Sequence, residues 1–282
     1  MTSLDDLRRR LRPPWPVLDV HVHPIACFSP HAVESPVEDA RRLAETARRA
    51  GVARACLFSL DRGSPYRPTP AQCRAANDWA LRMRDAAPEF FLPFCYVSPE
   101  HPEAAVAEID RCVGEEGMVG IKLWVARRAT DPGLDPILER AVALDVPALQ
   151  HAWYKTTGNL AGESTPADVA DLARRHPRAR ILMAHLNGAG LRGLAAIAGC
   201  RNVCVDTSGG DPEAGIVEAA VAALGPARVL YGSDAPIRHF GVSVAKVMGT
   251  DLPDTVKRDL LWNNTARLLP ARAGVSPIEG RA

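Results

Sequence analysis

The stretch Val17-Leu18-Asp19-Val20-His21-Val22-His23 combines the pattern of a buried strand with two side chains that bind metals. Apolar and β-branched residues dominate it, as is typical of strands. Side chains two positions apart on a strand share a face, so His21 and His23 point to the same side. Two imidazoles at this spacing supply half of the ligands of an ion such as Zn²⁺. We predict a strand over 17–21. The histidine pair by itself is a weak signal for a metal site, because surface and core histidines show the same spacing.

Seven more short apolar runs follow this one along the chain. The gaps between successive runs are long enough to hold a helix each, which is the arrangement of parallel strands joined by crossover helices. The eight predicted strands are Val17–His21, Arg54–Phe58, Phe91–Tyr96, Val119–Leu123, Val146–Gln150, Ile181–Ala184, Val203–Val205 and Val229–Tyr231.

The gaps carry helix signals. Pro36 opens a segment that Gly51 follows, and proline at the start with glycine after the end is typical of helices. Thr69-Pro70 and Thr165-Pro166 place a capping residue before a proline. The predicted helices are 36–50, a second that opens at Thr69-Pro70, 103–113, 136–144, 165–175, 191–198, 212–224 and 253–262.

Eight strand–helix units predict an α/β fold, a single-domain (β/α)₈ barrel. We place the barrel at residues 17–270, after an N-terminal extension at 1–16 and before a flexible C-terminal tail at 271–282. An open, doubly wound sheet is the main alternative. No GxGxxG or GxxxxGK[ST] follows any strand, so nucleotide binding has no motif support.

Composition narrows the partners and the compartment. The 34 basic and 33 acidic residues nearly balance, so no overall field favours nucleic acid or an anionic membrane. Seven cysteines without a CxxC pair predict reduced thiols, and we find neither a secretory signal nor an apolar run of about 18 residues. We therefore predict a cytoplasmic protein whose partner is a small-molecule substrate, and we leave a homodimer open.

Polar side chains follow three of the later strands. His151 ends the fifth strand, His185 the sixth and Asp234 the eighth. Barrel enzymes build their active sites at the C-terminal ends of the strands, so these residues are expected beside His21 and His23. Taken singly, His185 or Asp234 could equally cap a helix. The five together predict a catalytic metal site.

At this point the motifs resemble a known family. HVH on strand one, QH on strand five, AH on strand six and GSD on strand eight are similar to the amidohydrolase superfamily. GIKLW, ILMAHLNG, VDTSG, LYGSDAP and the closing NNTARL most resemble its amidohydrolase-related (amidohydrolase 2) branch, which also contains non-oxidative decarboxylases and lactonases. The resemblance covers about Val17 to Leu269.

The resemblance implies a role for each strand-end residue. It implies one divalent metal ion, Zn²⁺ first with Mn²⁺ or another first-row ion as alternatives, held by His21, His23, His151 and Asp234. Such an ion lowers the pKa of bound water toward ~7. Asp234 would accept the proton of that water, and His185 would act as an acid or base or polarise the substrate.

Five further residues are expected to bind substrate: Lys122, Trp124, Trp153, Arg238 and His239. In binuclear members of the superfamily a carboxylated lysine bridges two metals. The lysine of this branch is generally not used in that way, so we favour an ion-pairing or substrate-binding role for Lys122. Trp124 occupies a position where relatives often carry histidine. This difference bears on the identity of the substrate and not on the metal.

These observations predict a metal-dependent hydrolase in which metal-activated water attacks the carbonyl of a small amide, ester or lactone. The alternative is a non-oxidative decarboxylase, a carboxy-lyase that acts on a planar unsaturated or aromatic acid at the same site. Two other readings stay open: a lactonase that works without the ion, and a barrel that binds a ligand without catalysis.

Overall fold

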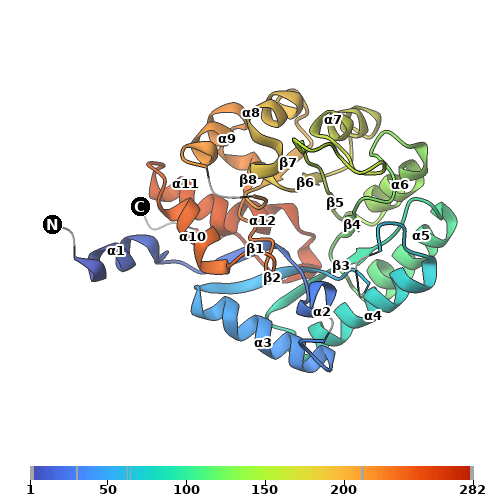
Figure 1. Ribbon diagram of the computed structural model, residues 1–282, viewed down its shortest axis with the longest axis horizontal. Helices are drawn as coiled ribbons and strands as arrows, with labels where there is room; N and C mark the ends of the chain where they lie inside the picture. The colour runs from blue at the N-terminus through green and yellow to red at the C-terminus, as the bar shows by residue number, and fades with distance from the viewer. Residues whose placement is uncertain (1–2, 30, 62, 64, 211–212, 280–282) are drawn as a thin grey trace.

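The computed structural model describes residues 3–29, 31–61, 63, 65–210 and 213–279. Eight parallel strands are hydrogen-bonded in the order β1 to β8 (Figure 1). The first and last strands also meet, because Val20 N–H donates to Tyr231 O over 2.9 Å and His23 N–H to Ala235 O over 2.7 Å. The predicted (β/α)₈ barrel is confirmed, and the open doubly wound sheet is not formed.

All eight predicted strands are present. Their bounds are β1 Val17–Val22, β2 Val52–Phe58, β3 Phe91–Tyr96, β4 Ile121–Leu123, β5 Ala148–Gln150, β6 Ile181–Met183, β7 Val203–Asp206 and β8 Val229–Leu230. The prediction started β4 and β5 too early, because the apolar residues Val119 and Val146 lie in the approaches to the strands.

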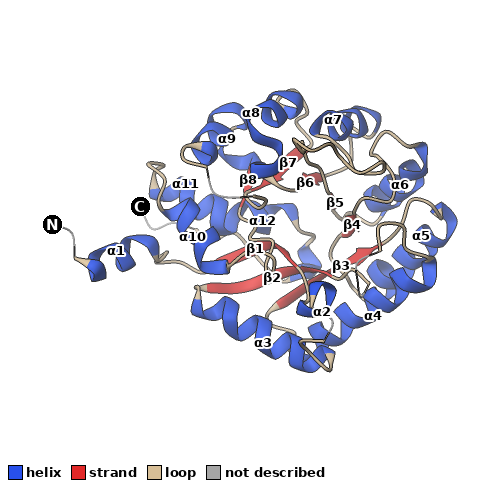
Figure 2. Ribbon diagram, viewed as in Figure 1, coloured by secondary structure: helices blue, strands red, loops and turns tan. Residues whose placement is uncertain are grey.

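Helices surround the strands on the outside of the barrel (Figure 2). They are α1 Leu4–Leu11, α2 Ile25–Phe28, α3 Pro36–Arg49, α4 Pro70–Ala86, α5 Pro102–Ile109, α6 Asp135–Ala143, α7 Pro166–Arg175, α8 Leu186–Ile197, α9 Ile216–Leu224, α10 Phe240–Met248, α11 Asp254–Arg258 and α12 Asn264–Leu268. Capping side chains mark the starts of several helices. Ser35 accepts from Glu38 N–H at the start of α3, and Thr69 with Gln72 forms a capping box at α4.

Several helices differ from the prediction. Helices α1, α2, α10 and α12 were missed, and the segment predicted at 253–262 forms α11 and the π-helical turn Asp259–Asn263. Helix α8 begins at Leu186 rather than Leu191 and is kinked at Gly190, whose φ is +60°. The predicted start of a helix at Pro212 lies outside the described residues.

Apolar side chains fill the interior of the barrel beneath the strand ends. They include Leu18, Val20, Phe58, Phe94, Leu149, Leu182 and Leu230. Gly120 leaves room for the Phe94 ring, since a Cβ on this glycine would lie 2.1 Å from it. This interior is a packed core, so a substrate must bind at the mouth.

The end of the chain covers part of this core. Leu268, Leu269 and Ala273 belong to the same apolar cluster, Trp262 Nε1 donates to Ser276 O over 2.9 Å, and Ile278 N–H donates to Asn263 Oδ1 over 2.6 Å. The division of the chain at residues 16 and 270 stays a prediction.

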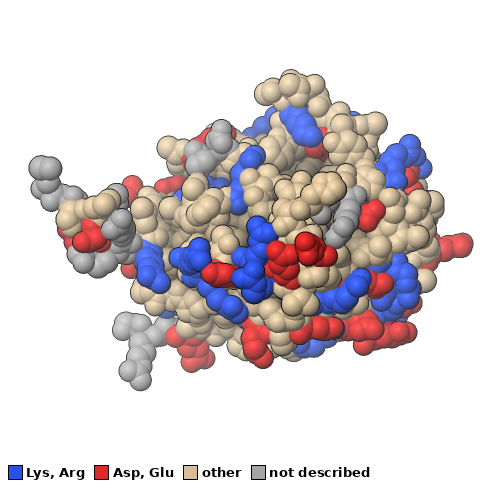
Figure 3. Space-filling view, turned by 60° about the horizontal axis from the view of Figure 1, so that its bottom comes forward, with Lys and Arg blue, Asp and Glu red and all other residues tan. Residues whose placement is uncertain are grey.

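The surface carries both signs of charge. Basic and acidic side chains are interspersed over the face drawn in Figure 3, in keeping with a net charge of +1. Within the described ranges, no helix combines the length and the apolar character needed to cross a membrane.

Candidate metal centre

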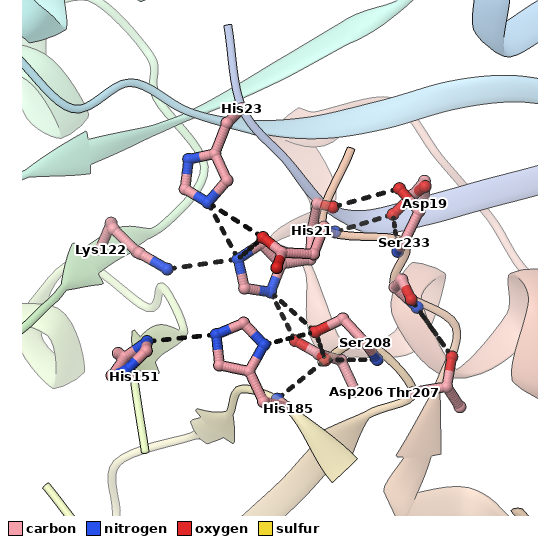
Figure 4. Close-up of polar contacts among 12 residues, drawn as sticks. Asp19, His21, His23, Lys122, His151, His185, Asp206, Thr207, Ser208 and Ser233 are labelled. Atoms are coloured by element: carbon pink, nitrogen blue, oxygen red, sulfur yellow. Dashed lines mark hydrogen bonds and ion pairs between the residues drawn. The ribbon is translucent and has the colours of Figure 1, made fainter. Parts of the chain in front are cut away.

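Strands β1 and β8 bring three donor groups together at the mouth of the barrel (Figure 4). The Nε2 atoms of His21 and His23 are 3.2 Å apart, and Asp234 Oδ1 lies 3.7 Å from the first and 3.6 Å from the second. All three residues are buried. Donor atoms of one tetrahedral ion with bonds of 2.0–2.1 Å are about 3.3 Å apart, so the spacing suits a single divalent ion.

The outer nitrogens of the two histidines fix their protonation. His21 Nδ1 lies 2.8 Å from Asp206 Oδ2, and His23 Nδ1 lies 2.6 Å from Phe58 O. A carbonyl or carboxylate oxygen only accepts, so we assign the proton of each neutral ring to Nδ1. Both Nε2 atoms then present lone pairs to each other. Facing lone pairs repel, whereas a cation between them is attracted by both.

A second pair of histidines repeats this arrangement. His151 Nε2 lies 2.8 Å from Glu163 Oε1, and His185 Nδ1 lies 2.9 Å from Ser208 Oγ, whose hydroxyl donates to Asp206 Oδ1. The protons are therefore again on the outer nitrogens. His151 Nδ1 and His185 Nε2 face each other over 3.1 Å, as Figure 4 shows. This pair can hold one proton or add a donor to the neighbouring metal site.

Burial keeps these rings in the form that binds metals. It lowers the pKa of His21, His23, His151 and His185 below the usual value, assisted in each case by nearby positive charge. A neutral imidazole is the ligand form. Carbonyl, carboxylate and hydroxyl groups outside the rings orient them, as in established metal sites.

Lys122 and Asp234 form the charged part of the site. Lys122 Nζ lies 3.4 Å from His21 Nε2, and burial lowers the pKa of the lysine to about 8, against the opposing effect of Asp234. Burial raises the pKa of Asp234 to about 7, against the opposing effect of Lys122. Each group therefore stabilises the charge of the other.

The backbone is strained where the catalytic candidates leave their strands. His185 has a φ of +76° and Asp234 a φ of +62°, a region that side chains other than glycine rarely adopt. Hydrogen bonds hold both residues: His185 N–H donates to Asp206 Oδ1 over 3.1 Å, and Asp234 N–H donates to His21 O over 2.8 Å. Such strain gathers at functional sites.

The structure therefore brings most of the predicted site residues together. His21, His23 and Asp234 form the compact donor group, while His151, His185 and Lys122 lie beside it. The Trp153 ring lies 5.0 Å from that of His185.

Three predicted substrate-binding residues lie outside this cluster. Trp124 packs against Tyr66, at 5.4 Å between ring centroids, and against the small cluster around Tyr96. Arg238 and His239 line a small cavity that adjoins the centre. The predicted ligand and substrate-binding roles stay predictions.

Sequence reasoning missed the residues that orient the histidines. Asp206 ends β7 within the VDTSG stretch, so its place at a strand end was a usable signal. Asp19 also lies within the quoted first strand, where its Oδ1 accepts from the N–H groups of His21 and Ser233, both over 3.0 Å. Glu163 had no such signal, because it lies in a long loop after β5 that folds back onto His151.

Solved structures of similar fold include decarboxylases and a hydratase. The chain superposes on 2,6-dihydroxybenzoate decarboxylase from Rhizobium with a TM-score of 0.71 and 17% identity, over 90% of this chain and 98% of that one. It superposes on 5-carboxyvanillate decarboxylase from Novosphingobium aromaticivorans, complexed with manganese, with a TM-score of 0.72 and 18% identity, over 90% and 96%. For 4-oxalomesaconate hydratase from Rhodopseudomonas palustris the TM-score is 0.69 with 16% identity, over 92% and 96%. At these identities the likeness is one of fold.

A curated relative matches over a shorter stretch. The 2-keto-4-carboxy-3-hexenedioate hydratase of a Sphingobium species is 36% identical over 90 residues, which are 28% of this chain and 26% of the relative. The match thus spans about a quarter of that protein's length. The sequence model of the amidohydrolase family, by contrast, matches residues 18–271, nearly the whole barrel. The chain therefore belongs to the amidohydrolase family, as the motifs at its strand ends indicated.

Proposed function

We propose that the chain is a metal-dependent hydrolase, in which a water molecule activated at the metal centre attacks the carbonyl of a small amide, ester or lactone. One observation carries the metal dependence. The Nε2 atoms of His21 and His23 face each other over 3.2 Å with their protons on the opposite nitrogens. A cation there relieves the repulsion and also meets Asp234.

The donor set fits one divalent ion. His21 Nε2, His23 Nε2 and Asp234 Oδ1 would hold it, and His151 would supply the fourth donor. Nitrogen-rich ligation favours Zn²⁺, while manganese, present in a structural neighbour, is the main alternative. When bound, the ion supplies Lewis acidity and lowers the pKa of water.

The surrounding residues supply the proton transfers. Asp234 has a second carboxylate oxygen that accepts the proton of the attacking water. His185 Nε2 carries a lone pair in the neutral ring, so it would first take up one proton, shared with His151 Nδ1, and then donate that proton to the leaving group. Ser208 and Asp206 keep its ring in place. Lys122 stabilises negative charge that develops beside His21.

A carboxy-lyase or hydratase reaction is the second candidate. Trp153 supplies a flat apolar wall 5.0 Å from His185, which suits a planar unsaturated or aromatic acid. The similar solved structures include decarboxylases and a hydratase. Because hydrolases and lyases can use the same metal centre, only the reaction products distinguish the two candidate functions.

The test is product analysis in H₂¹⁸O with metal-loaded wild type, Asp234→Asn and the control His31→Ala, which alters an exposed histidine. The panel holds esters, lactones, amides and aromatic or unsaturated acids. Hydrolysis of an ester or amide yields two products, one with ¹⁸O in a new carboxylate, whereas hydrolysis of a lactone yields one hydroxy acid with ¹⁸O in its carboxylate; neither releases CO₂. Asp234→Asn should lose at least ~10²-fold in rate, and His31→Ala should match wild type.

The other outcomes are distinct. Release of CO₂ would establish the carboxy-lyase, and gain of labelled water without bond cleavage would establish a hydratase. Turnover that survives complete removal of metal would overturn the metal-dependent mechanism.

A further inference from the structure

A small cavity opens beside the metal centre, between the segment after β7 and the stretch from the end of β8 into α10. Its volume is about 200 Å³. The residues that line it are Ser208, Gly209, Gly210, Ser233, Ile237, Arg238, His239, Val242, Ser243 and Lys246. This lining, taken over the described part of the chain, holds two basic side chains, Arg238 and Lys246, and no carboxylate.

The cavity shares its wall with the metal centre. Ser208 Oγ lies 2.9 Å from His185 Nδ1 and 3.4 Å from His21 Nδ1. Ser233 immediately precedes Asp234, and Arg238 N–H donates to Asp234 O over 3.1 Å. A small molecule that reacts at the centre can therefore extend one of its groups into the cavity.

Lys246 lies at the cavity and has one N–H donor that no described residue accepts. The half-buried ammonium donates to Asn187 Oδ1 over 2.7 Å and to Thr207 O. Both acceptors are uncharged, and an ammonium has three N–H donors. The third donor and the full positive charge are available to a ligand in the cavity.

Arg238 supplies the second cation. Its Nε donates to Gly209 O over 2.9 Å, which leaves the two terminal nitrogens for another acceptor. Gly209 has a φ of +111°, and a Cβ there would lie 3.0 Å from Gly188 N, so this close approach requires glycine. The loop after β7 thereby anchors the arginine.

Neither cation makes a close ion pair with a described residue, although the carboxylates of Asp206 and Asp234 attract Lys246 and Arg238 at longer range. Among the residues that the structure describes, no carboxylate oxygen lies within 4.0 Å of Arg238 or Lys246, whereas Arg67 and Arg127 on the same rim both pair with Glu100. For the half-buried Lys246 a charge without a close ion partner is costly, and binding an anion offsets that cost, while the exposed Arg238 is free to reach the same anion. Arginine and lysine together suit the oxygens of a carboxylate or a phosphate.

We propose that Arg238 and Lys246 form an anion subsite, and that the substrate is a small acid with a second anionic group that binds there while its reacting group lies at the metal centre. This inference rests on the proposed function for the reacting end. The subsite itself is defined by binding, so it can be tested without turnover.

Three probes that differ only at one end test the subsite. Pentanoate, glutarate and 4-phosphonobutyrate share a carboxylate and three methylenes, and end in methyl, carboxylate and phosphonate. Calorimetry on the metal-loaded full chain should show at least ~10-fold tighter binding of one dianion than of pentanoate, as expected for a charge-assisted contact. The better dianion identifies the class of anion.

Two variants locate the effect. Arg238→Met alters an exposed side chain, and Lys246→Met is first checked for native circular dichroism. Each should reduce the preference for the dianion to within about twofold of pentanoate, with unchanged affinity for pentanoate. Arg192→Met is the matched control, because this cation lies on the same face over the Tyr154 ring and outside the cavity.

The proposal is overturned if both dianions bind no better than pentanoate, if neither binds at millimolar concentration, or if the preference survives in Arg238→Met. Loss of the preference in Arg192→Met would equally overturn it, since the charge of the whole rim would then be responsible. A failure of the proposed function looks different: the protein would hold no metal, yet the preference for dianions would remain and would depend on Arg238.

Discussion

The Nε2 atoms of His21 and His23 lie 3.2 Å apart, and in the tautomers that we assign neither carries the proton of its ring. Each proton then lies on Nδ1, where it is donated to Asp206 or to the Phe58 carbonyl. The two lone pairs repel each other, and since Lys122 Nζ, 3.4 Å from His21 Nε2, contacts only one of them, a cation between the rings stabilises the pair. We therefore expect this site to bind a metal ion.

The facing pair of His21 and His23 predicts the metal content of the protein. Purified wild type should hold about one equivalent of divalent metal per chain, and the His21→Ala/His23→Ala double variant should hold almost none. Elemental analysis after dialysis measures both, with His31→Ala as the control. Two equivalents in wild type would indicate a second ion near Lys122, and none in a folded wild type would contradict the centre.

Asp206 should matter for metal affinity although it is not a proposed ligand. It accepts from His21 Nδ1 and from the backbone of His185, so Asp206→Asn loosens both rings. We expect metal to bind about 10- to 100-fold more weakly. Titration against a competing chelator measures this, with the exposed Asp251→Asn as the control. Equal affinities would assign Asp206 to folding alone.

Acid stability should depend on Glu108, which lies in a network that joins α4, β3 and α5. Burial favours its neutral form, but hydrogen bonds from Arg111, Asn77 and Cys112 outweigh this and lower its pKa below the ordinary 4.5. The unfolded chain then binds more protons at acid pH, so the contribution to stability is present above pH 4.5 and is lost as the pH falls below it.

The variant Glu108→Gln tests this sign. At neutral pH it should be less stable by about 1–3 kcal/mol, because a charged hydrogen-bond acceptor is lost. Its midpoint of thermal unfolding should fall less steeply than that of wild type as the pH drops below 4.5. Parallel curves for the two proteins would show that Glu108 titrates alike in the folded and unfolded chains.

The barrel interior should not tolerate a methyl group at Gly120. A Cβ there would lie 2.1 Å from the Phe94 ring, so Gly120→Ala must displace a buried aromatic side chain. We expect a loss of about 1–3 kcal/mol in the free energy of unfolding, measured with denaturant. Gly114→Ala, where a Cβ meets no atom within 4 Å, should change stability little.

The prediction of the fold succeeded where short apolar runs alternate with capped helices. It missed α10, because Phe240–Met248 follows the irregular stretch after β8 without a proline or a conventional capping side chain, and His239 caps it instead. It started β4 and β5 early because apolar residues also line the approaches to strands. In both cases the hydrophobic pattern indicates which residues are buried but does not determine the backbone conformation.

The two-residue period of the first strand and the eight strand–helix repeats are enough to place five polar residues at strand ends around one mouth: His21, His23, His151, His185 and Asp234. The folded barrel was needed to show which nitrogen of each ring faces inward, and that Lys246 and Arg238 line one cavity. The reason is that the groups that orient these side chains, such as Asp206, Phe58 O, Glu163 and Gly209, come from other strands and loops. These hydrogen bonds join residues that are far apart along the chain and that meet only in the folded barrel, so no local sequence pattern predicts them.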